Sequence, residues 1–103
     1  MKEDAKPRYV ISVAAEILET RTYTLRYYEK VGIIRPARSA GNIRLYSDMD
    51  LALLRRVRTL MEDLGVNLAG VEVILRMSQQ IAQLQAEADK TDAELARLRS
   101  ETE

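Results

Sequence analysis

The stretch from Thr24 to Tyr46 decides the fold, and it reads TLRYYEKVGIIRPARSAGNIRLY. Its first part predicts a short helix with an arginine- and tyrosine-bearing face. Its second part predicts a hairpin-sized loop that carries three arginines. A helix that fits a DNA groove, next to a ribbon whose arginines match phosphate oxygens, makes a surface suited to nucleic acid. The rest of the chain can then act as scaffold and dimeriser.

The composition limits what kind of protein this can be. The chain has 103 residues, of which 47% are hydrophobic, so we expect one small domain with a modest core. No apolar run is long enough to span a membrane and no secretion leader is recognisable, which predicts a cytoplasmic protein. Cysteine and histidine are both absent. Their absence excludes disulfides, thiol redox sensing and zinc or copper sites built from them, and we expect no cofactor.

The net charge of zero hides an asymmetry along the chain. Residues 1–60 carry 12 Lys/Arg and 7 Asp/Glu, a balance of +5, whereas residues 61–103 carry 4 and 9, a balance of −5. A basic front and an acidic back are typical of a protein that presents one end to nucleic acid. Ordinary variation in solvated charge explains the same asymmetry about as well.

Two short helices are predicted ahead of the hairpin. Ser12 is a good N-cap for a helix of about two turns, and the apolar pattern shifts phase near residues 19–21, where we place a turn. Thr22 can cap a second helix that runs to about Val31, and Gly32 is a natural residue to end it. Two short helices joined in this way predict a helix-turn-helix.

The second helix has two different faces. Leu25 and Tyr28 lie three residues apart and are predicted to face the core. The opposite face is polar, aromatic and cationic, as a DNA-recognition helix requires, although a solvated surface would look similar. Arg26 is predicted to contact a base edge. The predicted DNA contacts on this helix are Thr22, Tyr23, Arg26, Tyr27 and Lys30.

A two-stranded wing is predicted to follow. Ile33–Ile34 and residues 43–46 read as short strands around a tight turn at residues 40–42. Arginine forks match phosphate oxygens, so the wing is predicted to hold the DNA backbone and thereby position the helix. The predicted contacts in this segment are Arg35, Arg38, Arg44 and Tyr46.

Two more helices are predicted after the wing. Ser47 should cap the third, whose arginines at positions 55, 56 and 58 are assigned to a solvated face. Gly65 should end this helix, and Asn67 can cap a fourth. The predicted buried stripe of the third helix consists of Met49, Leu53, Leu54, Val57, Leu60, Met61 and Leu64.

The segment 78–103 is predicted to be a coiled-coil dimerisation helix. Apolar residues alternate steps of three and four along it, as in a heptad seam. Its other faces are polar, so alone it would bury little surface, and a second copy is the simplest partner. The alternative is a helix that folds back on its own domain. The predicted seam consists of Met77, Ile81, Leu84, Ala88, Thr91, Leu95 and Leu98.

These motifs resemble the MerR family of transcriptional regulators over roughly residues 9–77. The resemblance rests on TLRYYE at 24–29, VGII at 31–34, Pro36, RLY at 44–46 and LGVNL at 64–68. It implies a mainly α fold in which a winged helix-turn-helix domain precedes a long helix that pairs antiparallel with its twin. Residues 9–15 and 65–71 are similar to the heat-shock repressor (HspR-like) branch. That branch implies repression of chaperone genes from an inverted repeat, with the chaperone DnaK as co-repressor.

The sequence therefore predicts a homodimeric, sequence-specific DNA-binding repressor with a flexible arm at residues 1–8, a DNA-binding domain at 9–77 and a dimerisation helix at 78–103. One alternative is a MerR-type activator that distorts its promoter. Another is a coiled-coil adaptor whose basic front binds RNA. An enzyme is the weakest interpretation, because His, Cys and a Gly-rich phosphate loop are all missing. Without a sensor domain, the predicted switch is a macromolecule or the protein's own stability.

Overall fold

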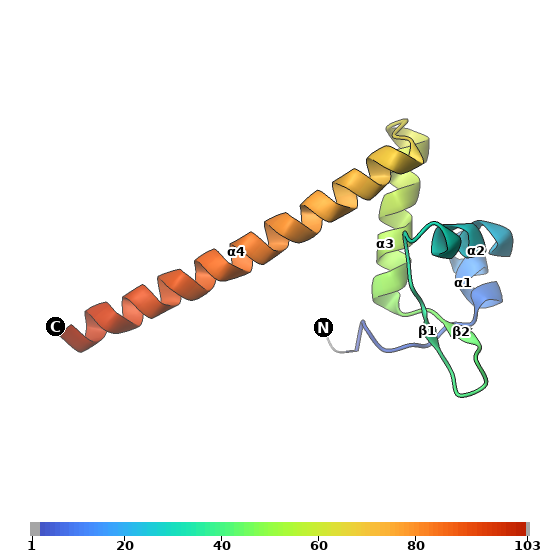
Figure 1. Ribbon diagram of the computed structural model, residues 1–103. Helices are drawn as coiled ribbons and strands as arrows, with labels where there is room; N and C mark the ends of the chain where they lie inside the picture. Colours follow the sequence, from blue (N-terminus) through green and yellow to red (C-terminus); the bar gives the residue numbers. More distant parts are fainter. Residues whose placement is uncertain (1–2, 103) are drawn as a thin grey trace. The chain divides into compact units, whose positions relative to one another are not determined.

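The computed structural model describes residues 3–102, which form two compact units, one ending at Val66 and one beginning at Asn67. The predicted mainly α fold, with a two-stranded wing and a long C-terminal helix, is confirmed (Figure 1). Residues 1 and 2 of the predicted arm, and residue 103 of the predicted coiled-coil helix, lie outside the described residues. The elements are α1 (Ile11–Ile17), α2 (Thr22–Lys30), β1 (Ala37–Arg38), β2 (Arg44–Leu45), α3 (Asp48–Arg58), the π-helical turn η1 (Thr59–Asp63) and α4 (Leu68–Thr102).

The first two helices begin slightly earlier than predicted. Val10 and Arg21 occupy the N-cap positions, and neither side chain makes a capping hydrogen bond. Ser12 and Thr22 therefore lie inside their helices, and their assignment as caps was wrong. For α1 the reason is tertiary: Tyr9 pairs with Tyr46 in an antiparallel bridge. This bridge holds the chain extended through Val10, and the helix starts directly after it.

The turn predicted between α1 and α2 is confirmed, and it uses a residue other than glycine. Glu19 has a φ of 53°, in the left-handed region. The amide of Thr20 donates to the carbonyl of Ala15 at 2.9 Å, which closes the end of α1. α2 ends as predicted, because Gly32 has a φ of 88°. The two helices thus form the predicted helix-turn-helix.

The wing is shorter than predicted and begins later. Its two strands are antiparallel, with Ala37 opposite Leu45 and Arg38 opposite Arg44. Ile33 and Ile34 are buried in the core and belong to neither strand, so that part of the prediction was wrong. Pro36 explains the later start, because it has no amide hydrogen to donate to a ladder.

The predicted tight turn at the tip of the wing is present. Asn42 adopts a φ of 64°, and its amide donates to the carbonyl of Ser39 at 2.9 Å. The amide of Ser39 in turn donates to the carbonyl of Ile43 at 2.8 Å. Ile43 is 56% exposed at this tip.

One hydrophobic core joins the helix-turn-helix, the base of the wing and α3. Tyr46 is fully buried within it, and its backbone pairs with the segment that leads into α1: the amides of Arg8 and Tyr9 both donate to the carbonyl of Tyr46. The wing is therefore tied to the start of the helix-turn-helix as well as to α3. The core cluster consists of Ala14, Ala15, Leu18, Leu25, Ile34, Tyr46, Leu51 and Leu54.

α3 begins at the predicted cap. The Ser47 hydroxyl accepts from the amide of Asp50 at 3.1 Å, and the Asp50 carboxylate accepts from the amide of Ser47 at 2.9 Å. These reciprocal bonds form a capping box. They satisfy two backbone donors at the point where the chain leaves the wing.

The buried stripe predicted for the third helix was only partly right. Val57 and Leu54 are buried, but Met49 is 60% exposed and Leu64 is 66% exposed, and the core takes Leu51 instead. Apolar residues at positions 51, 53 and 54 cover several sides of one turn, so periodicity alone does not choose the inner face. Beyond residue 58 the π-helical turn η1 also changes the phase of the helix.

α4 is one uninterrupted helix of 35 residues. The Asn67 side chain accepts from the amide of Gly70 at 2.8 Å, so the predicted cap is confirmed. At 1.5 Å per residue the helix is about 52 Å long. It continues without a break through residues 77 and 78, where the boundary between the DNA-binding domain and the dimerisation helix is predicted. Neither glycine nor proline occurs after Gly70 to interrupt it. No helix within residues 3–102 has the length and apolar character needed to cross a membrane.

Candidate nucleic-acid interface

The outer face of α2 is exposed, as predicted. Leu25 is 1% exposed and anchors the helix in the core, which turns the opposite face outward. Tyr23 is 66% exposed and Tyr27 is 50% exposed, while Arg26 and Lys30 are exposed beside them. Thr22 is half-buried at the first turn. The helix therefore presents two phenols and two cations together on one face.

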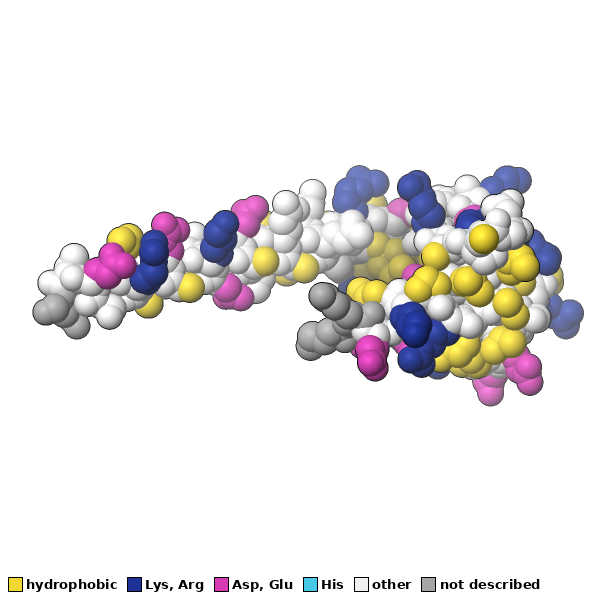
Figure 2. All heavy atoms as spheres, turned by 90° about the horizontal axis from the view of Figure 1, so that it is seen from below, with side chains coloured by type: hydrophobic (Ala, Val, Ile, Leu, Met, Phe, Trp, Pro, Cys, Tyr) yellow, Lys and Arg dark blue, Asp and Glu magenta, His cyan; other side chains and the backbone are white. Residues whose placement is uncertain are grey.

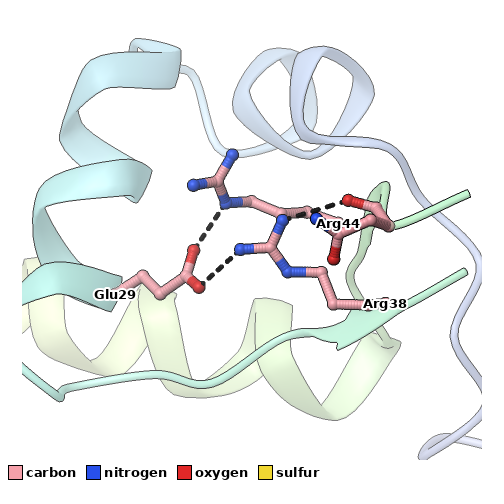
Figure 3. A network of polar contacts seen from close by, with 4 residues as sticks. Glu29, Arg38 and Arg44 are labelled. Atoms are coloured by element: carbon pink, nitrogen blue, oxygen red, sulfur yellow. Dashed lines mark hydrogen bonds and ion pairs between the residues drawn. The ribbon is translucent and has the colours of Figure 1, made fainter.

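Arg38 and Arg44 do not project freely from the wing, because both approach Glu29 of α2 (Figure 3). The Arg44 Nε donates to Glu29 Oε1 at 2.5 Å, and the Arg38 Nη2 donates to Glu29 Oε2 at 3.0 Å. Arg38 Nη1 also donates to the carbonyl of Asn42 at 3.2 Å. Arg35, which precedes β1, is exposed. Arg38 and Arg44 are therefore both paired with the helix, although Arg38 stays exposed, whereas Arg35 is exposed and lies outside this pairing.

Glu29 belongs to the candidate site but is not among the predicted contacts, although the sequence contains a signal for it. Glu29 is the only acidic residue between Thr20 and Ser47, a segment with six Lys/Arg. It lies in the last turn of α2, where the helix dipole disfavours a carboxylate. The hydrogen bond from Arg44 and the adjacent Arg38 hold the pKa of Glu29 below the ordinary value of a glutamate. Glu29 also raises the pKa of Arg44.

Tyr46 was predicted to contact DNA, and the structure contradicts this. Its side chain is fully buried, because it belongs to the core cluster formed with residues of α1, α2 and α3. Burial raises the pKa of the Tyr46 phenol. Its hydroxyl has no hydrogen-bond partner within residues 3–102. Tyr46 is therefore a core residue beneath the wing.

The three arginines of α3 differ from one another. Arg55 and Arg56 are exposed, as predicted. Arg58 is half-buried, and its Nη1 donates to the carbonyl of Leu18 at the end of α1. Arg58 therefore joins α3 to the helix-turn-helix and does not belong to a solvated face.

The residues predicted to form the dimer seam are exposed along α4. Figure 2 shows hydrophobic side chains that recur between charged ones along this helix. Ile81 and Leu84 are each 64% exposed, and Leu95 and Leu98 are each 46% exposed. Met77 is 54% exposed, and Ala88 and Thr91 between them are exposed as well. A single chain therefore leaves the whole apolar seam uncovered.

Comparison with protein families identifies residues 9–78 as a MerR HTH family regulatory protein. The chain is 46% identical to a heat shock protein, HspR, of Streptomyces coelicolor over 89 residues, which cover 86% of this chain and 59% of that protein. It is 33% identical to the HTH-type transcriptional regulator GlnR of Bacillus anthracis, over 91% of this chain and 70% of GlnR. This chain thus spans less than two thirds of the length of the HspR relative.

Two solved structures share the fold. HiNmlR, a MerR family regulator that lacks the sensor domain and is bound to promoter DNA, matches 88% of this chain and 75% of its own, with a TM-score of 0.63 and 22% identity. A MerR family transcriptional regulator from Bacillus cereus matches 89% of this chain and 78% of its own, with a TM-score of 0.58 and 28% identity. The helix-turn-helix, the wing, the long helix and the family match over residues 9–78 lead to one conclusion: this chain belongs to the MerR family of helix-turn-helix regulatory proteins.

Proposed function

We propose that the protein is a homodimeric, sequence-specific DNA-binding repressor of heat-shock or chaperone genes. One observation carries the proposal. The exposed Tyr23, Arg26, Tyr27 and Lys30 of α2 share one compact unit with an arginine-bearing wing that is ion-paired to the same helix. A helix of this kind reads base edges in the major groove, while wing cations hold phosphates.

The candidate contacts have different tasks. Arg26 presents a planar fork that matches the acceptors of guanine, so we assign it to a base edge. Tyr27 and Thr22 carry hydroxyls that suit phosphate oxygens, and Tyr23 and Lys30 flank them on the same helix. Arg35 is the exposed cation of the wing segment and is assigned to the DNA backbone.

We assign the contact with a second copy of the chain to α4. Its uncovered seam, from Met77 to Leu98, is the apolar surface that an antiparallel coiled coil would bury. A two-fold dimer presents two recognition helices related by symmetry, so its operator would be an inverted repeat. The similarity to HspR supports heat-shock genes as targets. A regulator of this kind would act in the cytoplasm, at the nucleoid, and we assign it no catalytic activity.

Binding to duplex DNA is tested by competition at matched salt. The full chain is titrated with labelled duplex, and unlabelled duplex or structured RNA is added as competitor. The proposal predicts that duplex competes much more strongly than RNA. Equal competition, or stronger competition by RNA, would support an adaptor with an RNA-binding front instead.

Repression is tested by transcription in vitro on supercoiled and linear templates that carry the bound site. A repressor lowers transcript levels on both templates. An activator that untwists its promoter raises them, with a strong dependence on supercoiling. Higher transcript levels on addition of the protein would overturn the assignment as a repressor.

For regulation we propose that DnaK binds the dimer–operator complex and tightens it. A tenfold gain in affinity requires about 1.4 kcal/mol of coupling. Purified DnaK is titrated into a gel-shift assay at fixed temperature, and operator affinity should rise. If DnaK leaves affinity unchanged while warming alone abolishes binding reversibly, the protein senses heat through its own stability.

A further inference from the structure

We propose that Glu29 is the positioning residue of the candidate DNA surface, because its carboxylate holds Arg38 and Arg44 and so fixes the wing against α2. This inference rests on the proposed function, since the surface that Glu29 organises is the one assigned to DNA. It also gives Arg38 and Arg44 a role other than the phosphate contacts that the sequence predicts for them.

Both strands of the wing bind the single carboxylate of Glu29. Glu29 Oε1 accepts from Arg44 on β2 at 2.5 Å, and Glu29 Oε2 accepts from Arg38 on β1 at 3.0 Å. Arg38 and Arg44 are direct partners in the strand register. A carboxylate that binds both members of a cross-strand pair restrains the two strands together, and Figure 3 shows the two guanidinium groups converging on it.

The wing has little else to hold it at this place. Each strand has two residues, and both residues of β1 are exposed. A two-stranded hairpin of this size is marginal alone in water. Within residues 3–102, the side-chain hydrogen bonds described between the wing and α2 all end on Glu29. Arg38 also restrains the turn at the tip of the wing, because it donates to the carbonyl of Asn42.

The partial burial of Glu29 and Arg44 favours a positioning role for this pair over two independent surface charges, although Arg38 is 36% exposed. The Glu29 and Arg44 side chains are 22% and 27% exposed, so their charges are only partly screened by water. The guanidinium Nε of Arg44 and the Nη2 of Arg38 are already engaged by the protein. A phosphate would have to compete with Glu29 for these donors, whereas Arg35 is exposed and forms no ion pair within residues 3–102.

The two roles predict opposite signs for one substitution. If Glu29 is only an acid near the DNA, Glu29→Gln removes repulsion and raises affinity. If Glu29 positions the wing, the same change loosens both arginines and lowers affinity. We expect Glu29→Gln to bind a labelled duplex, taken from selection on a random library, about fivefold to tenfold more weakly. The slope of log K against log salt should stay unchanged, because the number of neutralised phosphates stays the same.

Glu16→Gln is the matched control, because Glu16 is an exposed acid on α1 of the same unit. This variant should bind as tightly as the unaltered chain, or slightly more tightly. Amide hydrogen exchange provides a readout other than binding. The amides of Ser39 and Ile43 should exchange faster in Glu29→Gln, while those of α1 stay protected as in the unaltered chain. Exchange that rises equally throughout the unit would mean general unfolding, and positioning would then be overturned.

A double-mutant cycle separates the inference from the proposed function. Glu29→Gln and Arg44→Gln should each weaken binding, and the double variant should bind no more weakly than the weaker-binding single variant. If Arg44 instead neutralised a phosphate directly, Arg44→Gln would reduce the magnitude of the salt slope by about 0.9 per copy, and so by about 1.8 for the dimer. If the unaltered chain fails to bind duplex, the proposed function is wrong. If it binds and Glu29→Gln binds equally or more tightly, only the role of Glu29 is wrong.

Discussion

Tyr27 and Tyr46 have the same side chain but opposite environments in the structure. Tyr27 is half exposed on α2, whereas Tyr46 is fully buried beneath the wing. Both residues are predicted as DNA contacts from the sequence, because both lie in the arginine-rich segment from Thr24 to Tyr46. What separates them is the bridge between Tyr9 and Tyr46, a pairing between residues 37 positions apart. A local pattern carries no information about such a pairing, so the burial of Tyr46 could not be predicted from its neighbours.

The hydroxyl of Tyr46 should be dispensable. It is buried without a partner within residues 3–102, and an unpaired buried hydroxyl costs free energy. We expect Tyr46→Phe to leave the free energy of unfolding unchanged or to raise it by up to about 1 kcal/mol, with unaltered DNA binding. Tyr46→Ala, which empties the site, should cost about 3–5 kcal/mol. Thermal and denaturant unfolding measure both changes, and a clear loss of stability in Tyr46→Phe would show that the hydroxyl has a partner.

Arg26 should determine sequence preference. It is exposed on α2, and within residues 3–102 Glu29 pairs with Arg38 and Arg44 and not with Arg26. The guanidinium group of Arg26 is therefore available for a base edge. Arg26→Ala should cost about 1–3 kcal/mol per half-site and relax the preference at one base position. Competition against an operator altered at single positions measures this effect. Arg55→Ala, which removes an exposed arginine from α3, is the control and should leave the preference intact. An Arg26→Ala variant with unaltered discrimination would contradict the assignment.

At the scale of elements, some helix ends and faces could be predicted from the sequence and others could not. Gly32 and the caps at Ser47 and Asn67 could be placed from sequence because each depends on local backbone chemistry. The caps predicted at Ser12 and Thr22 were wrong, because both residues lie inside their helices. The inner face of α3 could not, because it depends on which leucines meet the core and on a π-helical turn that shifts the phase. The pairing of Glu29 with the wing could not be predicted either, since its partners Arg38 and Arg44 lie 9 and 15 residues further along the sequence.

The turn between α1 and α2 stores backbone strain at Glu19. Its φ of 53° places an L-residue in the left-handed region, which glycine adopts at much lower cost. We expect Glu19→Gly to raise the free energy of unfolding by about 0.5–1 kcal/mol, the residue's strain outweighing the greater entropy of an unfolded glycine. Glu16→Gly, inside α1, should lower it by about 1 kcal/mol. If chemical denaturation finds the two variants equally destabilised, the strain at Glu19 is not significant.

At the scale of the whole molecule, the seam of α4 is the apolar surface that a single chain leaves uncovered. A 35-residue helix that leaves Ile81, Leu84 and Leu95 exposed gains little from folding alone. The heptad that predicted this seam could be read from sequence, because its period depends only on spacing. The partner that covers it is a proposal, which dimerisation measurements can test directly.

Dimerisation should depend on the leucines of the seam. Each of Leu84 and Leu95 would bury most of a side chain in a coiled coil, worth roughly 1.5–3 kcal/mol per copy. Replacing both with Lys adds buried unpaired charge, so we expect Leu84→Lys with Leu95→Lys to sediment as a monomer and to lose specific DNA binding. Ala86→Lys with Ala93→Lys adds the same charges on the side of the helix away from the seam and should remain dimeric. A seam variant that still sediments as a dimer would contradict the assignment.

We propose that two copies of the α2-and-wing surface read one DNA site together. Selection of bound sequences from a random duplex library tests this most directly, because the selection returns the half-site and its spacing at once. We expect two copies of one half-site in inverted orientation, with a fixed centre-to-centre distance of about one helical turn of DNA, 34–36 Å, or a multiple of it. Enrichment of a single unrepeated site, of a direct repeat or of no sequence at all would contradict it.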